Sequence, residues 1–220
     1  MKDRTRAREL AAEFMAKGDA TGWFEALYQE GEAGKSVVPW ADRGASPSLV
    51  EFWKSSPQAT AGKTALVIGC GLGDDAEQLA EWGFATTAFD IAETAIRTAR
   101  DRFPKSKVQY QVADLFQPSL EWNRGFDFVF ESNTVQALPV SLRSKAIAQV
   151  AWFVKPAGKL LIVARGREPG EPEGDMPWPL SRVELGEFGR AGLQEKSFEN
   201  YFDNEEPPSR RYRVLYTRPE

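Results

Sequence analysis

From residue 63 onward, short apolar runs alternate with segments of helical period, and this alternation restricts the fold more than any other feature. The run at residues 64–69 is apolar almost throughout, which is typical of a strand buried on both faces of a parallel sheet. Strands separated by helices indicate right-handed βαβ units. The predicted fold is therefore α/β, with a doubly wound and mostly parallel sheet.

Seven strands are predicted, and the last two form an antiparallel hairpin because no helical segment separates them. The expected strands cover residues 64–69, 85–90, 108–113, 126–130, 159–164, 193–201 and 211–217. The expected helices between them cover residues 74–82, 93–103, 140–153 and 181–188.

The N-terminal part has a different pattern, in which apolar residues recur at helical spacing. Helices are predicted over residues 5–17, 21–30 and 48–53, with a loop rich in glycine and proline between the last two. We therefore expect a helical cap over residues 1–60 and the sheet domain over residues 61–220, in one globular unit.

Composition excludes several classes of function. The chain has no histidine and one cysteine, so it can form no Ser-His-Asp or Cys-His nucleophile system, no zincin motif and no internal disulfide. We expect no metal site, and the net charge of −4 does not favour a nucleic-acid partner. Because no apolar run approaches the roughly 20 residues of a membrane span, and no signal-type stretch follows the N-terminus, we expect a cytoplasmic protein without a membrane partner. We also predict a monomer.

A glycine-rich turn follows the first predicted strand. Gly69, Gly71 and Gly73 occupy alternate positions there, and a helix is predicted to begin directly after them. Glycine lets the backbone pass close to a ligand, and a helix N-terminus presents N–H groups. Open α/β sheets bind nucleotides at this first turn, so the pattern predicts a Rossmann-like nucleotide site. A glycine turn without a ligand is the alternative.

Acidic residues end the next two predicted strands. Asp90, followed by Ile91, is suited to bind two ribose hydroxyls, or alternatively to cap the following helix. Asp114 and Leu115 are suited to an adenine amino group and ring, or Asp114 only starts a turn before Pro118. Dinucleotide oxidoreductases share the glycine turn and the first acid, so these features leave the cofactor open.

Taken in order, these motifs resemble the class I S-adenosylmethionine (SAM) dependent methyltransferases over roughly residues 60–217. The resemblance rests on residues 67–73, 113–115, 126–130 and 154–161 together with the ribose acid; Ala157 stands where the family usually has a glycine. It implies that SAM is the cofactor. The residues that would bind it are Gly69, Gly71, Gly73, Asp90, Ile91, Asp114 and Leu115.

The N-terminal part resembles the thiopurine S-methyltransferase and halide/thiol methyltransferase group. The resemblance is carried by the aromatic helix at residues 23–28 and the Pro-Trp loop at residues 38–41. It implies that Trp23 and Trp40 close over SAM, where aromatic faces would attract the sulfonium. Packing in the core is the alternative for each tryptophan. Trp178, in a proline- and glycine-rich loop, is expected to line the acceptor site.

Residues 131–134 follow the fourth predicted strand, where many methyltransferases place groups facing the methyl donor and acceptor. Ser132 is expected to contact the cofactor. Glu131 is the candidate catalytic residue, as a proton acceptor, although the thiopurine enzymes tend to carry aspartate there and it could instead pair with an arginine. The Asn/Asp-Pro-Pro-Tyr motif is absent here, which argues against adenine or glutamine-amide methylation.

We therefore predict a SAM-dependent methyltransferase that acts on a small molecule by in-line displacement, mainly through proximity and alignment. With no histidine base, an acceptor that is ionised near neutral pH has the advantage, which favours a thiol, thiopurine or halide. A phenol or carboxylate is the alternative, because Arg165 or Arg167 could hold a carboxylate. A non-catalytic SAM-binding protein and an NAD-dependent oxidoreductase remain as competing functions.

Overall fold

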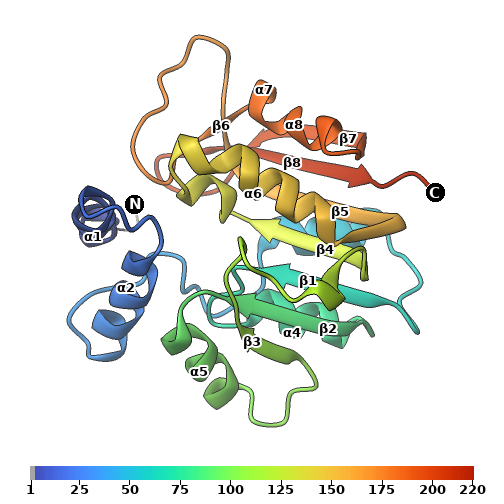
Figure 1. The fold of residues 1–220 in the computed structure, drawn as a ribbon, viewed down its shortest axis with the longest axis horizontal. Helices are drawn as coiled ribbons and strands as arrows, with labels where there is room; N and C mark the ends of the chain where they lie inside the picture. Colours follow the sequence, from blue (N-terminus) through green and yellow to red (C-terminus); the bar gives the residue numbers. More distant parts are fainter. Residues whose placement is uncertain (1–2) are drawn as a thin grey trace.

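The computed structural model describes residues 3–220, and its centre is one sheet with the strand order β3-β2-β1-β4-β5-β8-β7 (Figure 1). The first five strands are parallel, and β7 and β8 form an antiparallel hairpin in which β8 pairs with β5. The strands are β1 (Thr64–Ile68), β2 (Ala85–Asp90), β3 (Gln109–Val112), β4 (Phe126–Ser132), β5 (Val154–Arg167), β7 (Gln194–Phe202) and β8 (Arg210–Thr217). The predicted fold and its C-terminal hairpin are confirmed.

Two details of the sheet differ from the prediction. β5 begins at Val154 rather than residue 159, because the turn that precedes its apolar run still pairs with β4 through a register shift. In that turn Ala157 has a φ of +57°, a left-handed conformation that glycine adopts more readily and that explains why the family usually has glycine here. The two-residue strand β6 (Leu180–Ser181) was not predicted; it pairs with the end of β5.

Helices cover both faces of the sheet. Because side chains alternate along a strand, Leu66 and Ile68 face one layer while Ala65 and Val67 face the other. The first layer contains η1 (Leu120–Trp122), α6 (Val140–Phe153), α7 (Arg182–Leu185) and α8 (Glu187–Arg190), and the second contains α3 (Pro47–Ser55), α4 (Asp74–Glu81) and α5 (Glu93–Arg102). Figure 1 shows α6 in front of the sheet and α4 behind it.

Helices α1 (Thr5–Ala16) and α2 (Gly22–Glu32) lie beside the edge toward which β1 and β4 point (Figure 1). Their apolar residues form a separate cluster that reaches Ala137 and Met176. The third N-terminal helix behaves differently, because Leu49 and Phe52 of α3 are buried in the core of the sheet. Within the described part of the chain, we give the name cap to α1, α2 and the loop over residues 33–46, while α3 packs with the sheet.

Residues 3–220 lack two kinds of structural feature. None of their helices has the length and apolar character needed to cross a membrane. These residues also contain no group of three or more acidic or cysteine side chains placed to hold a metal ion.

Candidate active site

A cavity of about 750 Å³ lies between the cap and the carboxyl edge of the parallel strands. Its walls come from the ends of β1, β2, β4 and β5, the α2 helix, the loop before α3, and the tip of the β7–β8 hairpin. The cavity lies where β1 has β2 on one side and β4 on the other, the switch point at which open α/β sheets bind ligands. Its volume is within the usual range for small-molecule sites.

The glycine turn forms the floor of this cavity. Gly69 and Gly71 line it with φ angles of +61° and +52°. A Cβ atom on Gly71 would lie 2.9 Å from the hydroxyl of Tyr28, so the backbone and the cap approach each other closely there. Gly73 is not among the lining residues; a side chain at this position would overlap the Tyr110 hydroxyl, and its role is to let α4 pack against β3.

Asp90 lines the cavity at the end of β2 and is only 6% exposed. Its Oδ2 accepts the N–H of Gly71 and its Oδ1 that of Ala92, both at 2.9 Å. Burial raises the pKa of Asp90, while the backbone N–H donors oppose this shift. Each oxygen keeps capacity for a further hydrogen bond. The N-cap residue of α5 is Ala92, so Asp90 does not cap this helix from the N-cap position. Its carboxylate instead connects the glycine turn to the residue at which α5 begins.

The segment after β3 closes the same end of the cavity. Asp114 and Leu115 both line it, as does Ile91 after β2. Oδ1 of Asp114 also accepts the N–H of Phe116 at 2.8 Å. Asp114 therefore both lines the cavity and begins the turn that was its alternative role. This end of the cavity therefore has the carboxylate of Asp114 beside the apolar side chains of Leu115 and Ile91.

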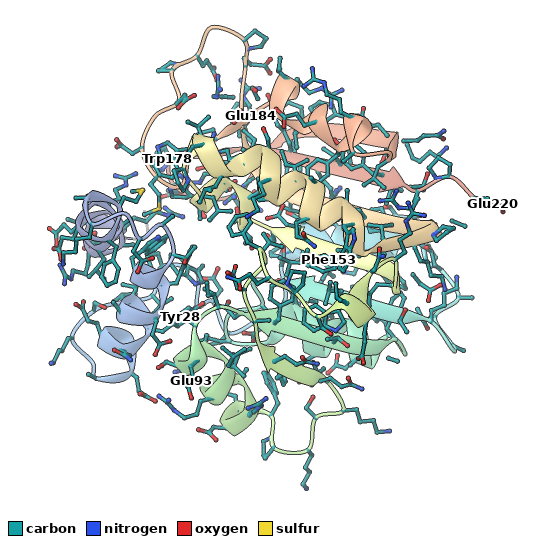
Figure 2. All side chains as sticks on the ribbon, viewed as in Figure 1. Tyr28, Glu93, Phe153, Trp178, Glu184 and Glu220 are labelled. Atoms are coloured by element: carbon teal, nitrogen blue, oxygen red, sulfur yellow. The ribbon has the colours of Figure 1, made fainter. Side chains whose placement is uncertain are left out.

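Aromatic residues of the cap lie over the glycine turn. The indole N–H of Trp40 donates to the hydroxyl of Tyr28 at 2.7 Å, and Trp40 is 38% exposed. Trp23 also lines the cavity, but it is 1% exposed and stacks on Phe24 at 3.8 Å, so it mainly belongs to the core of the cap. Tyr28 lies between α2 and the sheet (Figure 2) and was not predicted as a site residue. Its proximity to Gly71 depends on how the cap docks, which no local motif reveals.

The structure corrects the role expected for Glu131. Its side chain is 1% exposed and does not reach the cavity, whereas the adjacent Ser132 does. Oε1 of Glu131 accepts the N–H groups of Thr134 at 2.6 Å and Val135 at 3.0 Å, at the start of η2 (Val135–Ala137). Successive residues of a strand point to opposite faces, so only one of this pair can face the ligand. Burial raises the pKa of Glu131 to about 7, and the two N–H donors oppose this shift.

Trp178 also differs from the prediction. It is not among the residues that line the cavity, and the guanidinium of Arg143 lies 5.4 Å from its ring. Figure 2 places Trp178 beside the start of α6. The loop that carries it reaches the cavity through Met176 and Pro177 instead.

Charged residues gather at the opposite end of the cavity from Asp114. Arg165 on β5 and Arg211 on β8 both line it and are direct partners in the antiparallel register. Glu205 connects them, with Oε2 3.4 Å from Arg165 and Oε1 3.2 Å from Arg211. Arg4 lies 3.7 Å from the same carboxylate. Arg167, the other candidate for binding a carboxylate, is not among the lining residues and pairs with Glu184 at 3.2 Å.

Comparison with known proteins agrees with this architecture. Residues 65–158, from β1 to the turn within β5, match the family model of a methyltransferase domain. This stretch of the chain is therefore similar to a methyltransferase domain. Gly69, Gly71, Asp90 and Asp114 lie within the matched residues, and all four line the cavity.

Three known proteins show how far the likeness extends. Phosphoethanolamine N-methyltransferase 2 of Caenorhabditis elegans is 32% identical over 114 residues, which are 50% of this chain and 25% of that protein. The 2-heptyl-1-hydroxyquinolin-4(1H)-one methyltransferase of Mycobacteroides abscessus is 26% identical over 171 residues, 75% of this chain and 73% of that protein. A structure solved for the conversion of a disulfide bond into a thioacetal group during echinomycin biosynthesis has a TM-score of 0.73 at 21% identity, over 90% of this chain and 91% of that one. This last similarity shows the fold.

SAM is the methyl donor of this family, and the residues at the sheet edge fit it. The Asp90 oxygens can each accept a further hydrogen bond, as ribose hydroxyls require. Gly71 has no side chain at the point where the backbone meets the cavity, and a Cβ there would reduce the space below Tyr28. Leu115 and Ile91 offer apolar surface for a base.

Proposed function

We propose that this chain transfers a methyl group from SAM to a small molecule whose reacting atom is an anion. The observation that carries the proposal is that one cavity is lined both by Asp90 and Gly71 and by Arg165 and Arg211. A cofactor bound at Asp90 and Gly71 leaves the end of the cavity with Arg165 and Arg211 free for an acceptor. Because one chain supplies all of these residues, we propose that it acts as a monomer.

SAM supplies a methyl group on a positively charged sulfonium. The residues of this chain hold and align the reactants: Asp90 binds the ribose, Asp114 and Leu115 bind the adenine, and Ser132 lies at the end of β4 between the two halves. Tyr28 and Trp40 cover the glycine turn and exclude water. Alignment of two bound reactants can contribute about 7–11 kcal/mol to catalysis.

An ionised acceptor suits the side chains around the cavity. Glu131 is too deeply buried to take a proton from a ligand, and the carboxylates of Asp203 and Glu205 are bound to arginines. A thiol, a thiopurine or a halide reacts as an anion near neutral pH without a strong base, and we propose this class of acceptor. The resemblance of the aromatic cap to the thiopurine and halide/thiol enzymes supports it.

An acidic hydroxyl is the second candidate. The M. abscessus relative is named for a hydroxyquinolinone, and it aligns with three quarters of this chain. Such a hydroxyl loses its proton more readily than an aliphatic alcohol, so it meets the same requirement for an anion.

The test has two parts. Calorimetry should show micromolar binding of S-adenosylhomocysteine (SAH) and no binding of NAD. Incubation with SAM and a panel of thiophenol, 6-mercaptopurine, iodide, 2-heptyl-1-hydroxyquinolin-4(1H)-one and benzoate should release SAH with at least one thiol. If NAD binds more tightly than SAH, the assignment is wrong. If only the hydroxyquinolinone or benzoate reacts, the thiol preference is wrong and the methyl transfer stands.

A further inference from the structure

The arginine pair, Arg165 and Arg211, is an unfavourable arrangement for the free protein. The two residues are directly opposite each other on β5 and β8, and their side chains are only 17% and 13% exposed. Like charges at directly opposite positions of a sheet destabilise it. Burial, together with the positive charges of Arg4 and Arg211, lowers the pKa of Arg165 to about 10.

The neighbouring carboxylates do not balance this charge. The charged groups that act on Arg165 are the positive Arg4 and Arg211 and the negative Glu205 and Asp203. Asp203 is bound by Arg211 at 2.6 Å, and Glu205 is shared among all three arginines. Among the ion pairs of residues 3–220, these three guanidinium groups thus share two carboxylates. Charges buried with few partners of opposite sign are costly, so a bound anion would stabilise this end of the cavity.

The pair lies on the acceptor side of the sheet. In the strand order, β2 and β3 with the nucleoside residues lie on one side of β1, and β4, β5 and β8 lie on the other. Arg211 donates to Oδ1 of Asn133 at 3.1 Å, and Asn133 lines the cavity directly after the end of β4. An anion between the arginines would therefore lie beyond β4 and away from Asp90.

We propose that Arg165 and Arg211 bind an anionic substituent of the methyl acceptor, a carboxylate or a phosphate, in addition to Glu205. Guanidinium groups bind both anions through paired hydrogen bonds. The acceptor is then an amphipathic molecule with a reacting atom near Ser132 and a separate acidic group at the arginine pair. The identity of the reacting atom rests on the proposed function, whereas the binding of the anion does not.

Binding to the full-length protein in the presence of saturating SAH tests this without turnover. The probes are benzoate, phenyl phosphate and benzamide, which share a ring and differ in charge. The variants are Arg165→Met and Arg211→Met. The matched control is Arg210→Met, because Arg210 is adjacent on β8 but pairs with Glu168 at 3.0 Å and is not among the residues that line the cavity. Calorimetric titration with SAH establishes that each variant is folded.

Wild type and Arg210→Met should bind benzoate or phenyl phosphate at least about tenfold more tightly than benzamide, because hydrogen bonds to a charged group would be lost with the neutral probe. Arg165→Met and Arg211→Met should lose most of this preference and keep their SAH affinity. Preference for phenyl phosphate over benzoate identifies a phosphate, and the reverse a carboxylate. The proposal is wrong if wild type binds benzamide as well as the anions, if none of the probes binds, or if both cavity variants keep the preference.

A methyl-transfer assay distinguishes a failure of this proposal from a failure of the proposed function. Methyl transfer to 4-mercaptobenzoate is compared with transfer to 4-mercaptobenzamide. Anion binding without SAH release from any thiol would refute the thiol acceptor and leave the arginine pair intact. Equal transfer to both thiols, with no anion preference in binding, would refute the arginine pair and leave methyl transfer intact.

Discussion

Replacing Glu131 by Gln separates a structural role from a catalytic one. The amide keeps an oxygen that can accept the N–H groups of Thr134 and Val135, and it removes the charge. Within residues 3–220, the other carboxylate oxygen of Glu131 is buried and has no hydrogen-bond partner. The substitution therefore replaces an atom that forms no hydrogen bond in the native state with an amide nitrogen of similar size.

The expected effect depends on pH. Burial raises the pKa of Glu131 from 4.5 to about 7, so folding favours the protonated acid. Its contribution to stability is fully present below pH 4.5 and is lost as the pH rises through 7. A difference of this size corresponds to about 3 kcal/mol at most, on the order of a third of the stability of a typical domain. Glu131→Gln removes this dependence, so the variant should gain relative stability between pH 5 and pH 8.

Urea unfolding at pH 5 and pH 8 measures the effect, with Glu121→Gln as a control because Glu121 is exposed. The free energy of unfolding of wild type should fall relative to that of Glu131→Gln by about 1–3 kcal/mol over this interval, and the control should follow wild type. Methyl transfer by Glu131→Gln should stay close to the wild-type rate at pH 8. A pH-independent difference in stability would refute the assignment of the raised pKa. Loss of transfer with intact folding and SAH binding would restore the catalytic role.

Three further predictions follow from the site. Asp90→Ala should weaken SAH binding by about 1.5–3 kcal/mol and lower the melting temperature, since two backbone N–H groups lose their acceptor; unchanged affinity in calorimetry would exclude the ribose role. Gly73→Ala should lose at least about 1 kcal/mol more stability in urea than Gly18→Ala, because both have positive φ but only Gly73 meets a neighbour, Tyr110; equal losses would contradict this. We propose that the cap closes on the cofactor, so hydrogen exchange over residues 20–45 should slow when SAH is added, and unchanged protection would indicate a static cap.

Much of the sheet was predictable from local sequence. Strands buried on both faces need continuous apolar runs, and the helices between them need apolar residues at helical spacing, so each element leaves its own pattern. β2 (Ala85–Asp90) and α6 (Val140–Phe153) have the bounds that this pattern predicts. The placement of Gly71, Asp90 and Asp114 at one cavity was predictable for the same reason, because the carboxyl ends of parallel strands meet at one edge of the sheet.

The predictions that differ from the structure concern which way a side chain or helix face points, rather than where the residue lies in the fold. Glu131 and Ser132 are adjacent at the end of β4, and the sequence does not show which of them faces the cavity, since both faces of this strand are buried by other elements. The same holds for α3, whose apolar face could have packed against either the cap or the sheet; the fit of Leu49 and Phe52 against the sheet decided it.

The sequence by itself determined the α/β alternation, the glycine turn and the acidic ends of β2 and β3, because these depend on contacts within single βαβ units. Only the tertiary structure decided that Arg4, Arg165 and Arg211 meet around Glu205, and that Tyr28 lies over Gly71. These residues are far apart in the chain, and their meeting depends on the register of the β5–β8 pair and on the docking of the cap. Such contacts between distant segments leave no periodic signal, because they are fixed by the packing of whole elements rather than by the spacing of residues along one of them.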